Sequence, residues 1–370
     1  MELKGKYGKA KVFAKSLEDG ARDQIKEFLN QDFIEGSRVR IMPDVHQGMG
    51  CVIGFTADMG DKVIPNIVGV DIGCGMLTVE LGDTFVDLPK LDRIISSKIP
   101  SGSNVHKNRK QGFDKIQDLY VYRKLRNTRR MENSIGSLGG GNHFIELGLD
   151  SGDNKYLVIH SGSRNLGNQV ARIYQNLAID TCNKNIGTRE PYPRELCYLT
   201  GDNRREYLHD MKICQEYASL NREVMANIIL HSLFKRGLDE FIHFETVHNY
   251  INFKDNIIRK GAISAYEGER VLIPINMRDG SILAVGKGNK DWNFSAPHGA
   301  GRVLSRTAAK QELKLEEFKE SMKDIYSTSV HKDTLDESPS AYKDIEEILH
   351  SIKETVDVID IIKPIYNFKA

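Results

Sequence analysis

Glycines break the stretch from Met42 to Gly75 into short pieces, which limits what this part of the chain can fold into. They are Gly48, Gly50, Gly54, Gly60, Gly69, Gly73 and Gly75. The β-branched pairs Val63-Ile64 and Ile67-Val68 lie between them. Glycine supplies turn conformations and weakens helices, whereas β-branched residues favour strands. The stretch is therefore predicted to form short strands joined by tight loops, without helices.

Apolar spacing predicts further elements on both sides of this stretch. Helices are expected at Leu17 to Asn30, at about Arg204 to Arg236 with Tyr207, Met211, Cys214 and Tyr217 in the core, and near the C-terminus along Ile345, Leu349, Ile352, Val356 and Ile359. Strands are expected at Ser37 to Ile41, ending before Pro43, and at Phe253 to Arg259, Arg270 to Ile275 and Ser281 to Val285. Because strands and helices do not alternate regularly, the expected class is α+β: mixed β-sheets surrounded by helices in one catalytic body over residues 1–370.

Composition indicates the class of protein and the cellular compartment to expect. The 370 residues are 40% apolar and 28% charged, with 52 basic against 51 acidic side chains, as in a globular protein. The sequence contains no apolar run long enough for a membrane span and no secretory signal, so a cytoplasmic location is expected. The five cysteines are scattered, which argues against a disulfide framework. A cysteine that matters for function would then be a metal ligand or a nucleophile.

Charge is uneven locally although it is balanced overall. Between His106 and Arg130, nine lysines and arginines face only Asp114 and Asp118, and Tyr120 and Tyr122 lie among them. Such a stretch can bind phosphates and stack bases. It can equally be the solvated face of a helix, and the sequence leaves both interpretations open.

Five of the eleven histidines lie in glycine-rich or strand-end contexts. They are His46, His143, His160, His248 and His298. Any one of them alone would more simply be a hydrogen-bonded core residue. Together with Asp71 and Cys74 in the segment Asp-Ile-Gly-Cys-Gly, however, they predict a site for a divalent ion such as Mn²⁺, Zn²⁺ or Co²⁺, in which the thiolate can bridge two ions.

Paired metal ions suit phosphoryl chemistry, because they can hold both the attacking and the leaving oxygen. The sequence has no Walker loop to bind a nucleotide. The segments Gly139 to Asn142 and Gly299 to Arg302 could instead offer backbone N–H groups, with Arg164 and Arg302 as partners for phosphate. Each glycine cluster alone is a weak signal.

Several strings with histidine, cysteine or glycine follow one another along nearly the whole chain. They are Met-Pro-Asp-Val-His-Gln-Gly (Met42 to Gly48), Val-Gly-Val-Asp-Ile-Gly-Cys-Gly-Met (Val68 to Met76), Leu-Gly-Gly-Gly-Asn-His-Phe-Ile-Glu (Leu138 to Glu146), His-Ser-Gly-Ser-Arg (His160 to Arg164), His248-Asn249, Arg-Lys-Gly-Ala (Arg259 to Ala262), His-Gly-Ala-Gly-Arg (His298 to Arg302) and Ala-Tyr-Lys-Asp (Ala341 to Asp344), followed by the terminal Lys369. In this order they resemble the RtcB family of RNA-splicing ligases. So many strings in one order are highly specific, whereas any single one would carry a false-positive risk.

The resemblance implies an RtcB-like fold and a GTP- and Mn²⁺-dependent RNA ligase. Such an enzyme joins an RNA 3′-phosphate or 2′,3′-cyclic phosphate end to a 5′-hydroxyl end, in RNA splicing or repair, through 3′-guanylylated RNA. By the same resemblance, Cys74 would bridge two Mn²⁺ ions, and Asp71, His143, His160 and His248 would complete their ligands. His298 would be the nucleophile that carries GMP. An activating protein partner is compatible with this assignment, and a membrane is not expected.

Other positions correspond to the family's guanylate and RNA contacts. The expected nucleotide-binding residues are Asn142, His143, Phe144, Ile145, Glu146, His248, Asn249, Pro274, Ile275, Asn276, Met277, Ser281, His298, Gly299, Ala300, Gly301 and Lys369. Glu146 is a carboxylate that could accept two N–H bonds from guanine and reject adenine. Arg164, with the basic stretch, would hold the RNA backbone.

One segment departs from the pattern of many family members. Where those carry Pro-Gly-Ser-Met-Gly, this chain has Pro274-Ile-Asn-Met-Arg-Asp-Gly-Ser281, which brings the charges of Arg278 and Asp279 toward the expected nucleotide. Two other functions fit the same residues: a metal-dependent phosphoesterase that opens RNA cyclic phosphates without ligation, and a non-catalytic RNA-binding repair subunit. Formation of a covalent GMP adduct would separate the ligase from both.

Overall fold

The computed structural model describes residues 1–184 and 190–369. The helices are α1 (Asp19–Leu29), α2 (Pro65–Val68), α3 (Leu88–Lys98), α4 (Thr128–Ser134), α5 (Arg164–Cys182), α6 (Gly201–Phe234), α7 (Arg306–Glu312), α8 (Leu315–Ser321) and α9 (Ile345–Ser351). The strands are β1 (Glu2–Lys4), β2 (Lys9–Val12), β3 (Val39–His46), β4 (Ile53–Asp58), β5 (Gly75–Gly82), β6 (Phe144–Leu149), β7 (Lys155–Ser161), β8 (His243–Val247), β9 (Asn249–Ile251), β10 (Ile257–Lys260), β11 (Ala262–Ser264), β12 (Arg270–Asn276), β13 (Gly280–Gly286), β14 (Ser295–Pro297) and β15 (Val356–Lys369). None of these helices is both long and apolar enough to cross a membrane.

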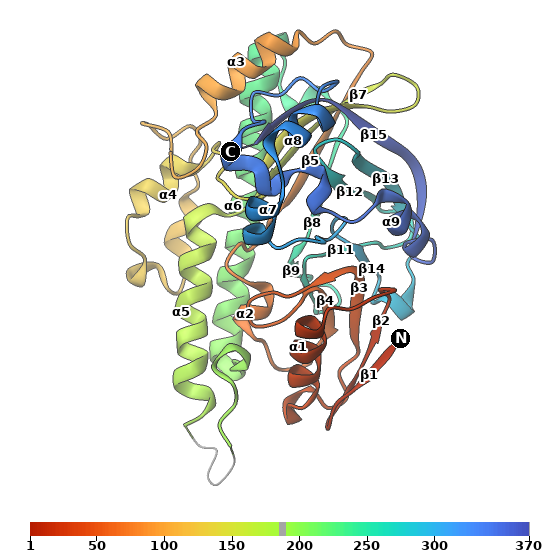
Figure 1. The fold of residues 1–370 in the computed structure, drawn as a ribbon. Coiled ribbons are helices and arrows are strands. Elements are labelled where there is room, and N and C mark those ends of the chain that lie inside the picture. The colour runs from red at the N-terminus through yellow and green to blue at the C-terminus, as the bar shows by residue number, and fades with distance from the viewer. Residues whose placement is uncertain (185–189, 370) are drawn as a thin grey trace.

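The described strands form two large sheets and a short strand pair. The order is β1-β2-β3-β4-β10-β9 in one sheet and β12-β13-β15-β6-β7-β5-β8 in the other, and β11 pairs with β14. Most neighbours are antiparallel, with β2 and β3 parallel. The first sheet contains the N-terminal strands and lies at the bottom of the view in Figure 1, below the second.

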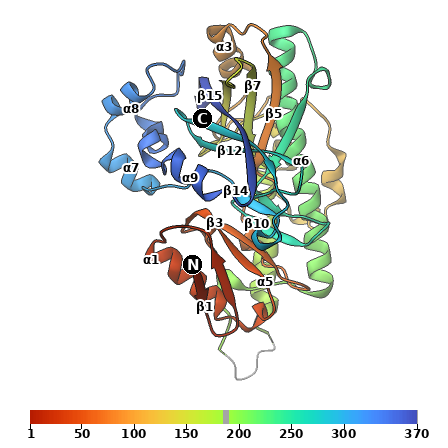
Figure 2. The same ribbon diagram turned by 90° about the vertical axis from the view of Figure 1, so that its right-hand side faces the viewer.

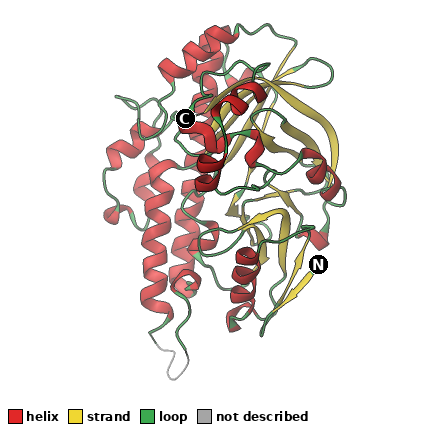
Figure 3. Cartoon of the chain, viewed as in Figure 1, coloured by secondary structure: helices red, strands yellow, loops and turns green. Residues whose placement is uncertain are grey.

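Helices cover the sheets from opposite sides. The long helices α5 and α6 lie along one side, and α7, α8 and α9 lie on the other (Figure 2). The buried side chains of α6 pack against β5, β7 and α3 and help to form the core beneath the seven-stranded sheet. The distribution of helix, strand and loop in Figure 3 is that of the α+β body expected from the sequence.

Several expected elements are confirmed. Helices α1 and α6, and strands β12 and β13, lie where the apolar patterns place them. Tyr207, Met211, Cys214 and Tyr217 of α6 are all buried. An amphipathic or apolar pattern was sufficient at these places because the elements are long or strongly alternating.

Three expectations are wrong in detail, and one of the two interpretations left open for the basic stretch is excluded. Strand β3 continues through Pro43 to His46, because a register shift between Ile41 and His46 removes the need for an N–H at the proline. A one-turn helix, α2, occupies Ile67-Val68, and β10 begins only at Ile257. The basic stretch is mostly loop with two 3₁₀ helices, η2 (Asp114–Asp118) and η3 (Tyr122–Lys124), before α4 begins, so it is not one solvated helix face.

The last expected helix is also wrong beyond its first turns. Helix α9 ends at Ser351, and Val356 starts β15, which pairs with β13 and then with β6. Ile359 is consequently 54% exposed. The spacing of apolar residues could not reveal these distant pairing partners, and tertiary pairing overrode the helical pattern.

Two adjacent residues of α6 hold the loops that surround the site described below. Arg222 is buried and donates to the backbone oxygens of Gly73 and Ser161, each at 2.8 Å, and to Glu245 Oε1 at 2.8 Å. Asn221 Nδ2 donates to Ser137 O at 3.2 Å, and Asn221 Oδ1 accepts from Gly136 N at 2.8 Å. Helix α6 thus fixes the loops at Gly73 and at Gly136-Ser137 and the end of β7, which are far apart in sequence.

We predict that Arg222→Met lowers the free energy of unfolding by about 3 kcal/mol, because two buried carbonyl oxygens and Glu245 lose their donor. Chemical denaturation measures the change. Arg236→Met is the control: its guanidinium is 45% exposed and pairs with Glu240, so its loss should cost less than about 1 kcal/mol. Equal effects of the two substitutions would contradict this role of Arg222.

Candidate active site

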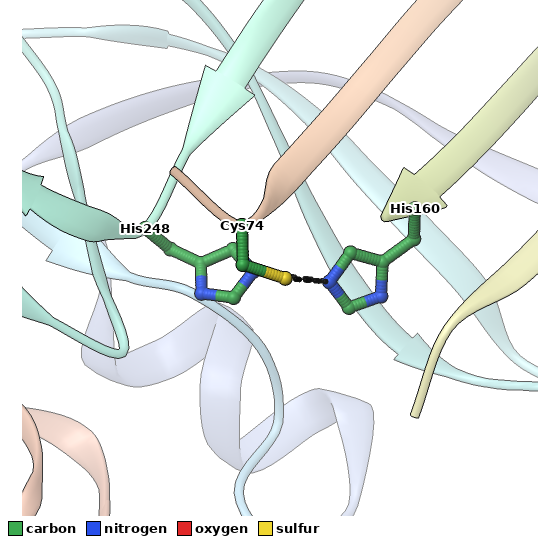
Figure 4. Close-up of side chains that lie close together, drawn as sticks. All are labelled: Cys74, His160 and His248. Atoms are coloured by element: carbon green, nitrogen blue, oxygen red, sulfur yellow. Dashed lines mark hydrogen bonds between the residues drawn. The ribbon is translucent and has the colours of Figure 1, made fainter. Parts of the chain in front are cut away.

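The glycine-associated histidines converge from strand ends on one region. His143 precedes β6, His160 lies near the end of β7, His248 lies between β8 and β9, and His298 follows β14. Cys74 directly precedes β5, which pairs with β7 on one side and β8 on the other. The strand order of the seven-stranded sheet therefore brings Cys74, His160 and His248 together, as Figure 4 shows.

Two groups of possible metal ligands share the Cys74 thiol. One comprises Cys74, His160 and His248, and the other comprises Asp71, Cys74 and His143; within each group the ligand atoms lie within 4.8 Å of one another. Cys74 Sγ is 3.5 Å from His143 Nε2 and 3.4 Å from His160 Nε2. All of these side chains are buried except Asp71, which is partly exposed. A sulfur, a carboxylate and imidazoles in this arrangement suit two borderline divalent ions bridged by one thiolate.

Burial sets the protonation of the group. It lowers the pKa of His160 and His248 well below the usual value, and the neighbouring histidines lower them further. Burial and then the Asp71 carboxylate raise the pKa of the Cys74 thiol. The imidazoles are thus neutral and ready to act as ligands, whereas the thiol needs a cation to favour its ionised form.

Hydrogen bonds orient the imidazoles. His143 Nδ1 donates to Leu138 O at 2.8 Å, and His160 Nδ1 lies 3.2 Å from Asn142 O, so the Nε2 atoms face the thiol. Gly139 makes this packing feasible: its φ is +89°, and a Cβ there would lie 2.8 Å from His143 Nδ1 and 1.9 Å from Arg164 Nη1. The glycine-rich loop before β6 is therefore a consequence of close approach at the site.

His298 stands beside this group and is held by Asp44. The rings of His248 and His298 have centroids 4.9 Å apart. His298 Nδ1 lies 2.6 Å from Asp44 Oδ2, and the backbone N–H of His298 donates to the same oxygen at 3.1 Å. Because the carboxylate accepts the Nδ1 proton, a neutral His298 keeps the lone pair on Nε2. Such an imidazole is a competent nucleophile.

His298 opens into a cavity of about 200 Å³. The lining residues are His46, Asn142, Phe144, Glu146, His160, His248, Pro274, Ile275, Asn276, Met277, Gly280, Ser281, His298, Gly299, Ala300, Gly301, Arg302, Arg306, Glu337, Tyr342, Asn367 and Lys369. The cavity thus joins the Cys74–His160–His248 group to a mixed polar and apolar pocket, the usual form of a small-molecule site.

Most of the residues expected to bind a nucleotide line this cavity, and three do not. His143 belongs to the second ligand group. Asn249 accepts from Gly261 N at 2.9 Å. Ile145 faces the core on the opposite side of β6 from Phe144, because side chains alternate along a strand.

The segment from Pro274 to Ser281, which differs from the family pattern, forms a turn between β12 and β13 that is closed by hydrogen bonds. Asn276 Oδ1 accepts from the backbone N–H groups of Arg278 and Asp279, each at 2.9 Å, and Arg278 pairs with Asp279 at 2.7 Å. Asn276 and Met277 line the cavity, whereas Arg278 and Asp279 are not among its lining residues. The two charges therefore neutralise each other rather than point into the cavity.

Some residues of the site were not anticipated from the sequence. Asp44, Glu337 and Asn367 act through contacts with His298, Lys369 and Glu146, which are distant in sequence. Asp44 could have been noticed, since it lies in the same Pro-Asp-Val-His string as His46. His46 itself lines the cavity, and its Nδ1 lies 3.0 Å from Asp44 O.

A buried thiol, carboxylate and imidazole group that could hold a metal, and that opens onto a pocket with an oriented histidine, is the arrangement expected of an enzyme active site. The family model "tRNA-splicing ligase RtcB" matches residues 24–370. The RNA-splicing ligase RtcB of Escherichia coli K12 is 32% identical over 93% of this chain and 92% of that protein. The tRNA-splicing ligase RtcB of Aeropyrum pernix is 28% identical over 83% of this chain and 82% of that protein. The chain therefore belongs to the RtcB family of RNA ligases.

We predict that Cys74→Ala lowers the content of bound divalent metal, because both ligand groups lose the atom that they share. Elemental analysis of the purified protein after dialysis against Mn²⁺ measures the content. Cys182→Ala, at a half-buried cysteine at the end of α5 outside both groups, is the control and should retain the wild-type content. Equal metal content in the two variants would remove Cys74 from the site.

Glu146 gives a second prediction, on pH dependence. Burial raises its pKa to about 8, against the lowering effect of Asn367 and Lys369. The folded protein then holds a proton that the unfolded chain releases, so stability falls as pH rises from about 5 to 8. Glu146→Gln has no carboxyl group to titrate at this position. The melting temperature of the variant should therefore rise relative to that of the wild type as the pH increases from about 5 to 8. A constant difference between the two proteins from pH 5 to 8 would contradict the raised pKa.

Proposed function

We propose that the chain is a GTP- and Mn²⁺-dependent RNA ligase that acts as a single domain over residues 1–370. It would join RNA 3′-phosphate or 2′,3′-cyclic phosphate ends to 5′-hydroxyl ends. The observation that carries the proposal is the placement of His298: Asp44 holds its Nδ1, and its ring lies 4.9 Å from that of His248 in the ligand group.

His298 is the nucleophile of the first step. Its Nε2 lone pair attacks the α-phosphorus of GTP, an N–P bond forms, and the bond to the leaving pyrophosphate breaks. The imidazole of the adduct then carries positive charge, which the Asp44 carboxylate stabilises through Nδ1–H. The same charge makes the imidazole a good leaving group when the RNA 3′-phosphate, to which a 2′,3′-cyclic end is first hydrolysed, attacks the phosphorus of GMP. The 5′-hydroxyl of the second RNA then displaces GMP and seals the strand.

The side chains of Asp71, Cys74, His143, His160 and His248 would hold two Mn²⁺ ions. Ions bound there supply positive charge for the phosphate groups in each step. The residues fit this role because the Cys74 thiol is common to both ligand groups and its buried setting favours ionisation only beside a cation. Arg222 would help to hold these ligand side chains in place, because it binds the backbone oxygens of Gly73 and Ser161, which are next to Cys74 and His160 in the sequence.

The polar residues of the cavity lining suit guanine. Glu146 presents a buried carboxylate, and Lys369 reaches Glu337, Asn142 O at 3.3 Å and the face of the Phe144 ring. Buried Ser281 adds a hydroxyl that has no partner in the protein. Acceptors and donors placed in this way can select one base edge and penalise another.

The RNA end would approach from a second hollow on the other side of the metal group. Its lining includes Asp71 and His143 of the second ligand group, together with Arg130 and Arg164. Arg164 Nη2 donates to Gly102 O at 2.9 Å, which fixes its guanidinium at this hollow. Arginine suits phosphate through paired donors. The nucleotide and the RNA would thus meet at the metal group from opposite sides.

We predict that His298→Ala abolishes transfer of labelled GMP from GTP to the protein and abolishes RNA sealing, while the protein stays folded. Gel detection of the labelled protein and of ligated RNA measures both. His331→Ala, at an exposed histidine, is the control. Labelling that survives in His298→Ala would exclude His298 as the nucleophile, and absence of labelling in the wild type would favour a phosphoesterase or an RNA-binding subunit.

A further inference from the structure

The last strand delivers two polar side chains into the nucleotide cavity. Asn367 and Lys369 both line it, as expected for alternate residues of β15. In the pairing of β15 with β6, Asn367 lies opposite Glu146. These two side chains come from strands more than two hundred residues apart in sequence, and both are almost fully buried, at 1% and 2% exposure.

The contact between them leaves one acceptor free on each. Asn367 Nδ2 donates to Glu146 Oε2 at 2.9 Å. Glu146 Oε1 and Asn367 Oδ1 are both buried and have no hydrogen-bond partner in the protein. Buried polar atoms without partners are uncommon in folded proteins and costly, so two on adjacent side chains in one cavity indicate a ligand.

The Glu337 carboxylate, which also lines the cavity, differs from Glu146 and Asn367 in this respect. Glu337 accepts from Lys369, from Tyr342 Oη at 2.7 Å and from Arg306 at 2.6 Å. That network is satisfied within the protein. The register of β15 on β6 is likewise set by backbone pairing and does not need the Asn367 side chain. A purely structural role therefore leaves the free oxygen of Asn367 unexplained.

We propose that Asn367 is a specificity-determining residue for the nucleobase, which acts together with Glu146. This inference rests on the proposed use of GTP. The Asn367 amide N–H donates to the Glu146 carboxylate. This bond fixes the orientation of the amide and leaves its oxygen available to accept a hydrogen bond from the base. When Glu146 is ionised, the form that N–H donors of a bound base favour, its free oxygen and that of Asn367 are two adjacent acceptors that match the ring N–H and the exocyclic amino group of guanine. Adenine offers a lone pair at the corresponding ring nitrogen and is repelled, and hypoxanthine lacks the exocyclic amino group.

The test compares equilibrium binding of GMP, IMP and AMP by calorimetry, because monophosphates have no pyrophosphate to lose and form no adduct. The wild type should bind GMP more tightly than IMP, and IMP more tightly than AMP. In Asn367→Leu, which keeps the size of the side chain, GMP affinity should fall at least about tenfold. AMP affinity should change less than about twofold, since the ribose and phosphate contacts remain.

Two further variants keep the inference falsifiable. Asn367→Ser, with a smaller side chain, should show the same loss of GMP preference if Asn367→Leu does not fold. Asn252→Leu alters a partly buried asparagine outside the cavity and should keep all three affinities. Retained wild-type ratios of GMP to IMP and AMP in both Asn367 variants, or a parallel loss for all three nucleotides, would overturn the inference.

The outcomes separate this inference from the proposed function. If the wild type prefers GMP and the Asn367 variants keep that preference, Asn367 is excluded while the ligase proposal stands. If the wild type itself does not prefer GMP over AMP, both the role of Asn367 and the proposed use of GTP fail. Loss of discrimination confined to the base, with His298 still able to accept labelled nucleotide from GTP at raised concentration, supports both.

Discussion

The sharing of one buried thiol by two ligand groups is the constraint on which the rest of the site depends. Cys74 lies between His143 on one side and His160 and His248 on the other, and each contact brings polar atoms together away from solvent. Such a cluster is stable only if cations or well-placed hydrogen bonds compensate its members. The central strands of the seven-stranded sheet, the glycine-rich loops and the buried Arg222 all serve to hold it.

Two hollows reach the cluster around Cys74, each through different ligand residues. The cavity with His298 reaches the cluster through His160 and His248, and the hollow with Arg164 reaches it through Asp71 and His143. A nucleotide on His298 and an RNA phosphate would therefore approach the same pair of ions from two directions. When both reactants are bound in a fixed orientation, they no longer need to meet by diffusion. Positioning of this kind accounts for a large part of catalysis in phosphoryl transfer.

The sequence predicted the α+β class and much of the candidate site, because the relevant signals are local. A histidine or cysteine beside glycines marks a close approach wherever it lies, as Gly139 beside His143 and Arg164 illustrates. Residues that contact the site only through the tertiary fold have no such local sequence signal. Asp44 contacts His298 and Asn367 contacts Glu146 only in the folded chain. Val356 and Ile359 continue the apolar spacing of the helix expected before them, but they belong to β15, whose first residues pair with β13.

The central claim is that two ions share the sulfur at position 74. The most direct measurement is anomalous diffraction at the manganese absorption edge from crystals grown with Mn²⁺. The account predicts two peaks, each within bonding distance of Cys74 Sγ, one flanked by Asp71 and His143 and the other by His160 and His248. A single peak, or peaks that the sulfur does not contact, would contradict it.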